Sequence, residues 1–180
     1  MTLREMIKIF EGANKRLISK DKSLFDAKVA ERSICGALAS CLREELNSDK
    51  KYLDYYVDVE YNRNAGEIKT IIDDELRVVK ITCDLIVHSR GQNKQQDNLI
   101  AIEMKKSTAK KMDKRKDKDR LIALTKDTFS ETWSYDGVTL PEHVCRYVLG
   151  VYYEINYSQR LILLEYYQKG KMVAERLIVF

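Results

Sequence analysis

Apolar and polar residues follow two periodicities along this chain, a helical one near its start and a strand-like one after it. Capping boxes of Thr2 with Glu5 and of Ser23 with Asp26 predict two helices, the second ending near 47–49. Later segments show the alternating or continuous apolar runs that are typical of strands. The predicted strands span 55–61, 78–88, 99–105, 146–155, 160–167 and 172–179, a third helix spans 117–129, a loop spans 134–143 and a hairpin turn lies at 169–170.

This order of elements predicts an α/β or α+β fold in which a helix crosses between the third and fourth strands of one sheet. The 180 residues are enough to enclose a core, so we expect a single domain covering 1–180. A hydrophobic fraction of 44% with 33% charged residues is typical of a globular protein rather than a disordered one.

The chain carries no sign of export or of membrane insertion. Its first residues lack the apolar core of a signal peptide, and no apolar run approaches the length of a membrane span. We therefore expect a cytoplasmic protein without a membrane partner. Four cysteines without a CxxC pair lie in apolar surroundings, which predicts free, buried thiols rather than a zinc site. They are Cys35, Cys41, Cys83 and Cys145.

Positive charge is concentrated in the segment 105–120, where nine of sixteen residues are Lys or Arg. The net charge of +4 by itself indicates no particular partner. One interpretation of the segment is the solvated face of a helix, as most charge runs are. The other is a rim that faces nucleic-acid phosphates, in which Lys106, Lys110 and Lys111 neutralise backbone charge. Both interpretations stay open at this point.

Two of the predicted strands carry ionisable residues on an otherwise apolar face. Alternation places Glu103 and Lys105 on the same face of their strand, with apolar residues on the opposite face. Asp84 interrupts one face of the preceding strand in the same way. If the polar faces match when the strands pair, Asp84 lies beside Glu103, and Lys105 lies two residues further along.

Two carboxylates on neighbouring strands can hold Mg²⁺, which prefers oxygen ligands and keeps waters or phosphate in its other positions. A lysine beside them can orient or deprotonate the attacking water, or stabilise charge at phosphorus. This combination predicts a Mg²⁺-dependent phosphodiester hydrolase in which Mn²⁺ can substitute. The competing interpretation is the polar outer face of a sheet. An Asp followed nineteen residues later by ExK, each within an apolar strand, favours catalysis.

Three more residues are candidates for the same site. Glu31 lies within the apolar stripe of the second helix, one turn before the apolar pair at 34–35, which predicts that it faces the core or a cleft. A position beyond the first turn weakens the alternative of an acid stabilised by the helix dipole. Glu60 is a candidate for which an exposed edge acid is a serious alternative. His88 can ligate metal or shuttle a proton, but a hydrogen bond to a neighbour is its favoured role.

Three segments resemble motifs of the PD-(D/E)XK nuclease superfamily, in particular of its small bacterial and phage-associated members. They are 58–63 (DVEYNR), 84–91 (DLIVHSRG) and 98–106 (NLIAIEMKK). The resemblance covers about 30–125 of the chain and implies a restriction-endonuclease-like αβββαβ core, here with an extra N-terminal helix and a C-terminal hairpin. Cys83 stands where the proline that names the superfamily precedes the aspartate. That proline shapes the backbone and takes no part in the chemistry.

The resemblance also implies a role for each matching residue. Asp84 and Glu103 are expected as metal ligands, and Glu31 as a further ligand, directly or through water. Lys105 is expected as the catalytic lysine. The residues expected to line the site or to meet a phosphate are Glu60, His88 and Arg90. Nucleic acid, with DNA favoured over RNA, is the expected partner.

Two other functions also fit the sequence. A nuclease fold can serve as a module that binds nucleic acid or a protein without cleaving, and Mg²⁺-independent affinity for DNA would identify it. An interaction protein of a phage-defence or mobile-element system would instead copurify with a protein partner and show no affinity for nucleic acid. Because no recognition domain is evident, a homodimer or a partner subunit is a further expectation.

Overall fold

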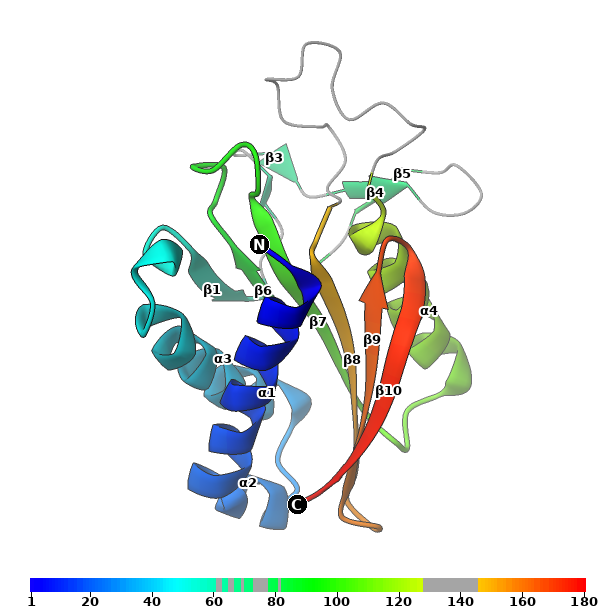
Figure 1. The fold of residues 1–180 in the computed structure, drawn as a ribbon. Coiled ribbons are helices and arrows are strands. Elements are labelled where there is room, and N and C mark those ends of the chain that lie inside the picture. The colour runs from blue at the N-terminus through cyan, green and yellow to red at the C-terminus, as the bar shows by residue number, and fades with distance from the viewer. Residues whose placement is uncertain (61–62, 65–66, 69, 73–77, 81, 128–145) are drawn as a thin grey trace.

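The computed structural model describes residues 1–60, 63–64, 67–68, 70–72, 78–80, 82–127 and 146–180. Among these residues, three α-helices lie on one face of a six-stranded sheet and a fourth lies on the other (Figure 1). This arrangement is the α+β fold that the sequence predicts. The helices are α1 (Leu3–Lys20), α2 (Lys22–Asp26), α3 (Glu31–Asn47) and α4 (Lys111–Thr125), and a 3₁₀ turn covers Lys50–Tyr52.

The central sheet has the strand order β1-β6-β7-β8-β9-β10. Its neighbours are antiparallel except for β7 and β8, which are parallel and joined through α4. Parallel strands need such a crossover, so the predicted helix between the third and fourth strands is confirmed. The strands are β1 (Tyr56–Val59), β6 (Leu85–His88), β7 (Asn98–Lys106), β8 (Leu149–Asn156), β9 (Leu161–Gln168) and β10 (Lys171–Val179). Two short hairpins outside this sheet are β2 (Arg63–Asn64) with β3 (Glu67–Ile68), and β4 (Thr70–Ile72) with β5 (Val78–Lys80).

The sheet buries a different core on each face. Toward α1 and α3 the core includes Phe10, Leu38 and Val87, and toward α4 it includes Ile86 and Leu124, all fully buried. Consecutive residues of β6 thus enter opposite cores, as the two-residue period of a strand requires. Each such side chain stabilises the fold by roughly 1.5–3 kcal/mol. This burial holds α3 and α4 on opposite sides of β6 and β7.

The predicted second helix is divided into α2 and α3. The expected capping box of Ser23 and Asp26 is wrong, because α2 follows Asp21 without a side-chain cap and ends at Asp26. Lys28 then adopts a left-handed backbone conformation with φ of 52°, which a right-handed helix does not contain. The chain therefore starts a new helix at Glu31.

Other boundaries agree with the expectations. Thr2 and Glu5 form the predicted capping box of α1, and α3 ends where the sequence indicates. Lys169 and Gly170 have φ of 51° and 73° and form the predicted turn between β9 and β10, whose two positive values suit a tight hairpin. The predicted loop at 134–143 lies outside the described residues.

The strand predicted for 78–88 is not continuous. Its first part is β5, which pairs with β4 outside the central sheet, whereas β6 begins only at Leu85. Residues before Leu85 therefore do not follow the alternation of the strand. Cys83 is buried with Ile86 in the core toward α4, whereas a continuous strand would place these two residues on opposite faces.

The helix predicted for 117–129 begins earlier, at Lys111. The first turns of α4 carry no apolar stripe, because the side chains that they direct toward the sheet are charged. Three cysteines, Cys35, Cys41 and Cys83, are buried thiols as predicted, while Cys145 lies outside the described residues. In the part of the chain that the structure describes, no helix is long and apolar enough to cross a bilayer.

Candidate functional site

The start of β6 and the middle of β7 bring two predicted carboxylates together. The paired residues of these strands include Leu85 with Ile102. One further step in this antiparallel register places Asp84 beside Glu103. Asp84 Oδ2 also accepts a hydrogen bond from the Met104 backbone N at 2.8 Å, which anchors the carboxylate to β7. The two acids are therefore neighbours, although Asp84 itself lies one residue before β6 begins.

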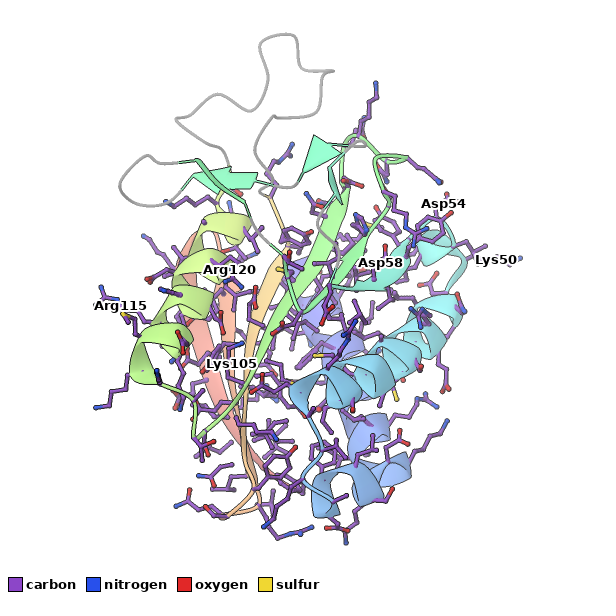
Figure 2. All side chains as sticks on the ribbon, turned by 180° about the vertical axis from the view of Figure 1, so that it is seen from behind. Lys50, Asp54, Asp58, Lys105, Arg115 and Arg120 are labelled. Carbon is purple, nitrogen blue, oxygen red and sulfur yellow. The ribbon has the colours of Figure 1, made fainter. Side chains whose placement is uncertain are left out.

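The ammonium group of Lys105 lies among three carboxylates. Its Nζ is 3.1 Å from Asp117 Oδ2 and 4.0 Å from both Asp84 Oδ2 and Glu31 Oε2. Burial alone would lower the pKa of Lys105, but the carboxylates, Asp84 foremost, outweigh burial and raise it. Figure 2 shows Lys105 between α4 and the first turns of α3. The side chain is therefore held as a cation within the site.

Glu31 reaches this group from the first turn of α3. Its Oε1 accepts a hydrogen bond from the Lys106 backbone N at 2.7 Å, and its Oε2 faces Lys105 Nζ. The expectation that Glu31 lies beyond the first turn is wrong, because the helix begins at Glu31 itself. Stabilisation of Glu31 by the helix dipole and its place in the site are therefore compatible. The N-terminus of α3 favours a carboxylate, and the same carboxylate contacts β7.

Glu103 is completely buried between α4 and the sheet. Its Oε1 accepts hydrogen bonds from Arg120 Nη1 at 2.6 Å and from Cys83 Sγ at 3.3 Å. Its Oε2 has no hydrogen-bond partner within the described part of the chain. Burial raises the pKa of Glu103 to about 8, although Arg120 opposes the shift. A buried carboxylate oxygen without a donor is unfavourable, so Oε2 is an atom that a bound cation would stabilise.

Asp117 and Arg120 of α4 complete the site, and the sequence-based interpretation did not include them. Arg120 Nη1 lies 3.4 Å from Asp117 Oδ1, so this guanidinium contacts both Asp117 and Glu103. Asp117 is only 4% exposed, and burial raises its pKa. The sequence does contain a signal for Asp117, because it precedes the buried Leu121 and Leu124 at helical spacing. Asp117 therefore belongs to the buried stripe of α4 rather than to its solvated face.

The basic segment is divided between the two sides of α4. On the inner side Lys114 Nζ lies 3.0 Å from Glu154, and Lys118 contacts Glu165 of β9. Figure 2 shows Arg115 directed outward from α4, away from the sheet. The exposed cations of this helix and its N-cap are Lys110, Lys111, Arg115 and Lys116. The solvated-face and phosphate-rim interpretations thus apply only to this outer set, because the inner set forms ion pairs within the protein.

Two further predicted residues lie at the edge of the site. The Glu60 backbone N donates to the Asp84 carbonyl oxygen at 3.1 Å, but its exposed carboxylate forms an ion pair with Arg32 at 3.0 Å. Lys106 lies beside the site through its backbone contact with Glu31. Its Nζ is directed toward the Lys28 carbonyl oxygen, 3.4 Å away.

His88 ends β6, roughly 13 Å along the chain direction from Asp84, and Arg90 follows in the turn after the strand. His88 Nε2 is 2.9 Å from Asp58 Oδ2, and Arg90 Nε donates to the same oxygen at 2.9 Å. Partial burial would raise the pKa of Asp58, but the hydrogen bonds from Arg90 and His88 lower it. Arg90 also stacks on Tyr56, 4.3 Å from the ring centre. The structure therefore groups these residues around Asp58, and His88 makes the neighbour contact that was favoured for it.

The chemistry of the donors fits a hard divalent cation. Glu31, Asp84 and Glu103 supply carboxylate oxygens, which Mg²⁺ and Mn²⁺ prefer, and Glu103 Oε2 is buried without a protein donor among the described residues. The same residues are not assembled around one point: across the described ranges, no three His, Cys, Asp or Glu side chains converge on a metal position. Lys105 lies beside Glu31 and Asp84, and Arg120 holds Glu103. The protein's own cations thus contact these acids in this arrangement.

No family model and no curated protein matches this chain. Among solved structures it is similar to a chain in a cryo-EM structure of a DrdV–DNA complex, with 13% sequence identity and a TM-score of 0.40. The similarity covers 98% of this chain, which spans only 12% of the length of that chain. A similarity of this size assigns no family, and conclusions about the site depend on its geometry alone.

Proposed function

We propose that this chain is a divalent-metal-dependent phosphodiester hydrolase of the PD-(D/E)XK type, with DNA as its favoured substrate. The observation that carries the proposal is the grouping of Glu31, Asp84 and Lys105 beside the buried Glu103. Such a set of carboxylates with one lysine can support metal-assisted hydrolysis of a phosphodiester. A sheet surface without this role would gain nothing from a buried carboxylate oxygen that lacks a donor.

Each residue has a distinct role in the proposed reaction. Glu31, Asp84 and Glu103 would hold the metal, and the side chains of Glu31 and Asp84 are 32% and 31% exposed, so solvent and substrate can reach them. The bound metal supplies Lewis-acid activation of the phosphate and a water of lowered pKa. Lys105 carries the positive charge that can orient this water or stabilise charge on the phosphate oxygens. The exposed cations Lys110 and Lys111 lie at the start of the helix that carries Asp117 and are candidates for backbone phosphate contacts.

A second function is favoured by one specific observation. Because Lys105 lies against Asp117 and Arg120 bonds Glu103, contacts within the protein already hold the group together without a metal. A chain with this network can bind nucleic acid through its exposed cations and leave the phosphodiester intact. This binding-module alternative predicts DNA affinity that does not change when EDTA replaces Mg²⁺.

The test is a cleavage assay on single- and double-stranded DNA and RNA with Mg²⁺, Mn²⁺ or EDTA. We expect cutting with either metal and none in EDTA. The variant Asp84→Asn, which keeps the shape of the side chain but removes its charge, should reduce turnover at least about a hundredfold. Asp113→Asn is the matched control, because Asp113 is an exposed acid in the first turn of α4.

The outcomes separate the two functions. Metal-dependent cutting that Asp84→Asn abolishes and Asp113→Asn retains supports the hydrolase, and the preferred substrate defines its class. Folded protein that binds DNA in EDTA and cuts nothing supports the binding module. Equal cutting by Asp84→Asn and the parent protein would remove this site from the reaction.

A further inference from the structure

The ammonium group of Lys105 has three carboxylate neighbours, and they differ in kind. Asp117 is the nearest, at 3.1 Å, and its side chain is only 6% exposed. Glu31 and Asp84, both at 4.0 Å, have side chains about one third exposed and are the proposed metal ligands. One neighbour therefore belongs to the interior of the protein, and two belong to the side on which a metal and a substrate would bind.

Asp117 is held firmly on α4. Its Oδ1 lies 3.4 Å from Arg120 Nη1, while its Oδ2 has no hydrogen-bond partner among the described residues but lies closest to Lys105 Nζ. Arg120 is itself fixed by the buried Glu103 at 2.6 Å. The helix packs on β7 and β8 through Leu121. The Asp117 carboxylate is therefore a fixed anion whose second oxygen is available to one cation.

A divalent cation beside Glu31 and Asp84 would compete with the ammonium group for the same oxygens. Two cations a few ångströms apart repel strongly in a partly buried site. The repulsion is relieved if the ammonium group can stay on the far side, against another carboxylate. Asp117 is placed to provide that carboxylate, because it is the closest acid to Nζ and is not among the proposed ligands.

We propose that Asp117 is a positioning residue, which holds the Lys105 ammonium group against α4 and so leaves the oxygens of Glu31 and Asp84 to the divalent cation. This inference rests on the proposed metal-dependent function. It assigns Asp117 no contact with metal or substrate, and its effect passes through Lys105 alone.

The test measures metal binding directly, through the loss of the free Mn²⁺ signal in electron paramagnetic resonance. Asp117→Asn removes the charge that attracts the ammonium group and preserves the size of the side chain. Among the described residues, Lys105 then keeps Glu31 and Asp84 as its acidic neighbours, so we expect the Mn²⁺ dissociation constant to rise about tenfold. Asp117→Glu retains a carboxylate and should bind Mn²⁺ close to the parent value. Asp113→Asn, on the same helix, should bind as the parent does.

The decisive comparison places Asp117→Asn in a Lys105→Met background. If Asp117 acts through the ammonium group, its replacement has no effect on Mn²⁺ affinity once that group is gone, so the two changes are strongly non-additive. In cleavage assays the Asp117→Asn variant should need more metal but reach parental turnover at saturating metal. A merely structural role would instead lower turnover at every metal concentration. If Asp117→Asn does not fold, as judged by its unfolding midpoint, Asp117→Ser replaces it in the same comparisons.

The outcomes distinguish this inference from the proposed function. A parent protein that binds no Mn²⁺ overturns both. A parent that binds Mn²⁺ while Asp117→Asn binds it equally well overturns the inference and leaves the metal site standing. Equal weakening by Asp117→Asn in the parent and in the Lys105→Met variant would also overturn it, because Asp117 would then act independently of the lysine.

Discussion

Glu103 combines complete burial with an incomplete set of partners. Arg120 and Cys83 contact Oε1, and Oε2 has no hydrogen-bond partner in the described ranges. Removing a carboxylate from water favours its neutral form, and burial accordingly raises the pKa of Glu103 from 4.5 to about 8. A single side chain thus makes the stability of the fold depend on pH near neutrality.

The direction of this dependence follows from proton linkage. Between pH 4.5 and about 8 the folded protein holds a proton on Glu103 that the unfolded chain releases. The contribution to the free energy of unfolding is therefore complete below pH 4.5 and is lost as the pH rises through about 8. The free energy of unfolding of the parent protein should therefore decline over this pH range. We expect Glu103→Gln to remove roughly 2–4 kcal/mol of this decline.

Urea unfolding at several pH values from about 5 to about 8.5, in EDTA, measures the effect. Glu175→Gln on the exposed strand β10 is the control and should leave the decline as in the parent protein. If the free energy of unfolding changes with pH equally in Glu103→Gln and in the parent protein, Glu103 stays ionised throughout the range.

At the scale of elements, α4 contacts the sheet in two different ways. Its first turns place charged residues over a polar row in which Glu103 of β7 pairs with Tyr152 of β8, and Tyr152 with Glu165 of β9. Its last turns bury Leu121 and Leu124 in the smaller core. The helix is therefore anchored by apolar packing at one end and positions ionic groups at the other.

The apolar end requires close approach of α4 to β8, and Gly150 permits it. A Cβ atom at this position would lie 2.9 Å from Thr125 Cγ2 and 3.1 Å from Tyr167 Cβ. We expect Gly150→Ala to destabilise the protein by about 1–3 kcal/mol, because the helix or the strand has to move. Gly36→Ala is the matched control. A Cβ atom added at Gly36 in α3 would have no atom within 4 Å, so this substitution should stabilise the protein by about 0.5–1 kcal/mol. Equal unfolding midpoints in urea for both variants would contradict this packing argument.

At the scale of the whole molecule, the sheet has one core on each of its faces. Figure 1 shows α1 and α3 on one side of the strands and α4 on the other. Polar contacts supplement the apolar packing of the first layer: Tyr153 of β8 donates to Asn14 Oδ1 at 2.9 Å, and Tyr166 of β9 donates to Glu11 Oε1 at 3.0 Å. These bonds fix α1 over the centre of the sheet.

The bond between Tyr153 and Asn14 is fully buried, since Asn14 is 1% exposed. Tyr153→Phe leaves the Asn14 amide oxygen without this donor and should lower the free energy of unfolding by about 1–3 kcal/mol. The double variant Asn14→Leu with Tyr153→Phe removes both polar groups and should recover most of that loss. Thermal unfolding followed by circular dichroism measures both. A double variant less stable than Tyr153→Phe alone would show that packing rather than the hydrogen bond dominates here.

Much of the fold could be predicted from local pattern. The strand that carries Glu103 and Lys105 has nearly the predicted bounds, because alternation over several residues is a local property. The capping box of Thr2 with Glu5 is correct for the same reason. The strand predicted for 78–88 is wrong in its first part, because an apolar run shows that a segment can form a strand without showing which strand it pairs with.

The sequence by itself determined which residues share a face: Glu103 with Lys105 on β7, and the apolar stripes of α1 and α3. Only the tertiary structure decided which charges meet. Glu31 enters the site because α3 begins there, and Asp117 and Arg120 enter it because α4 packs across β7. The physical reason is that periodicity records the environment of each residue along its own element. The contact between two buried charges depends instead on how elements distant in the chain pack and on which partner can offset the cost of burial.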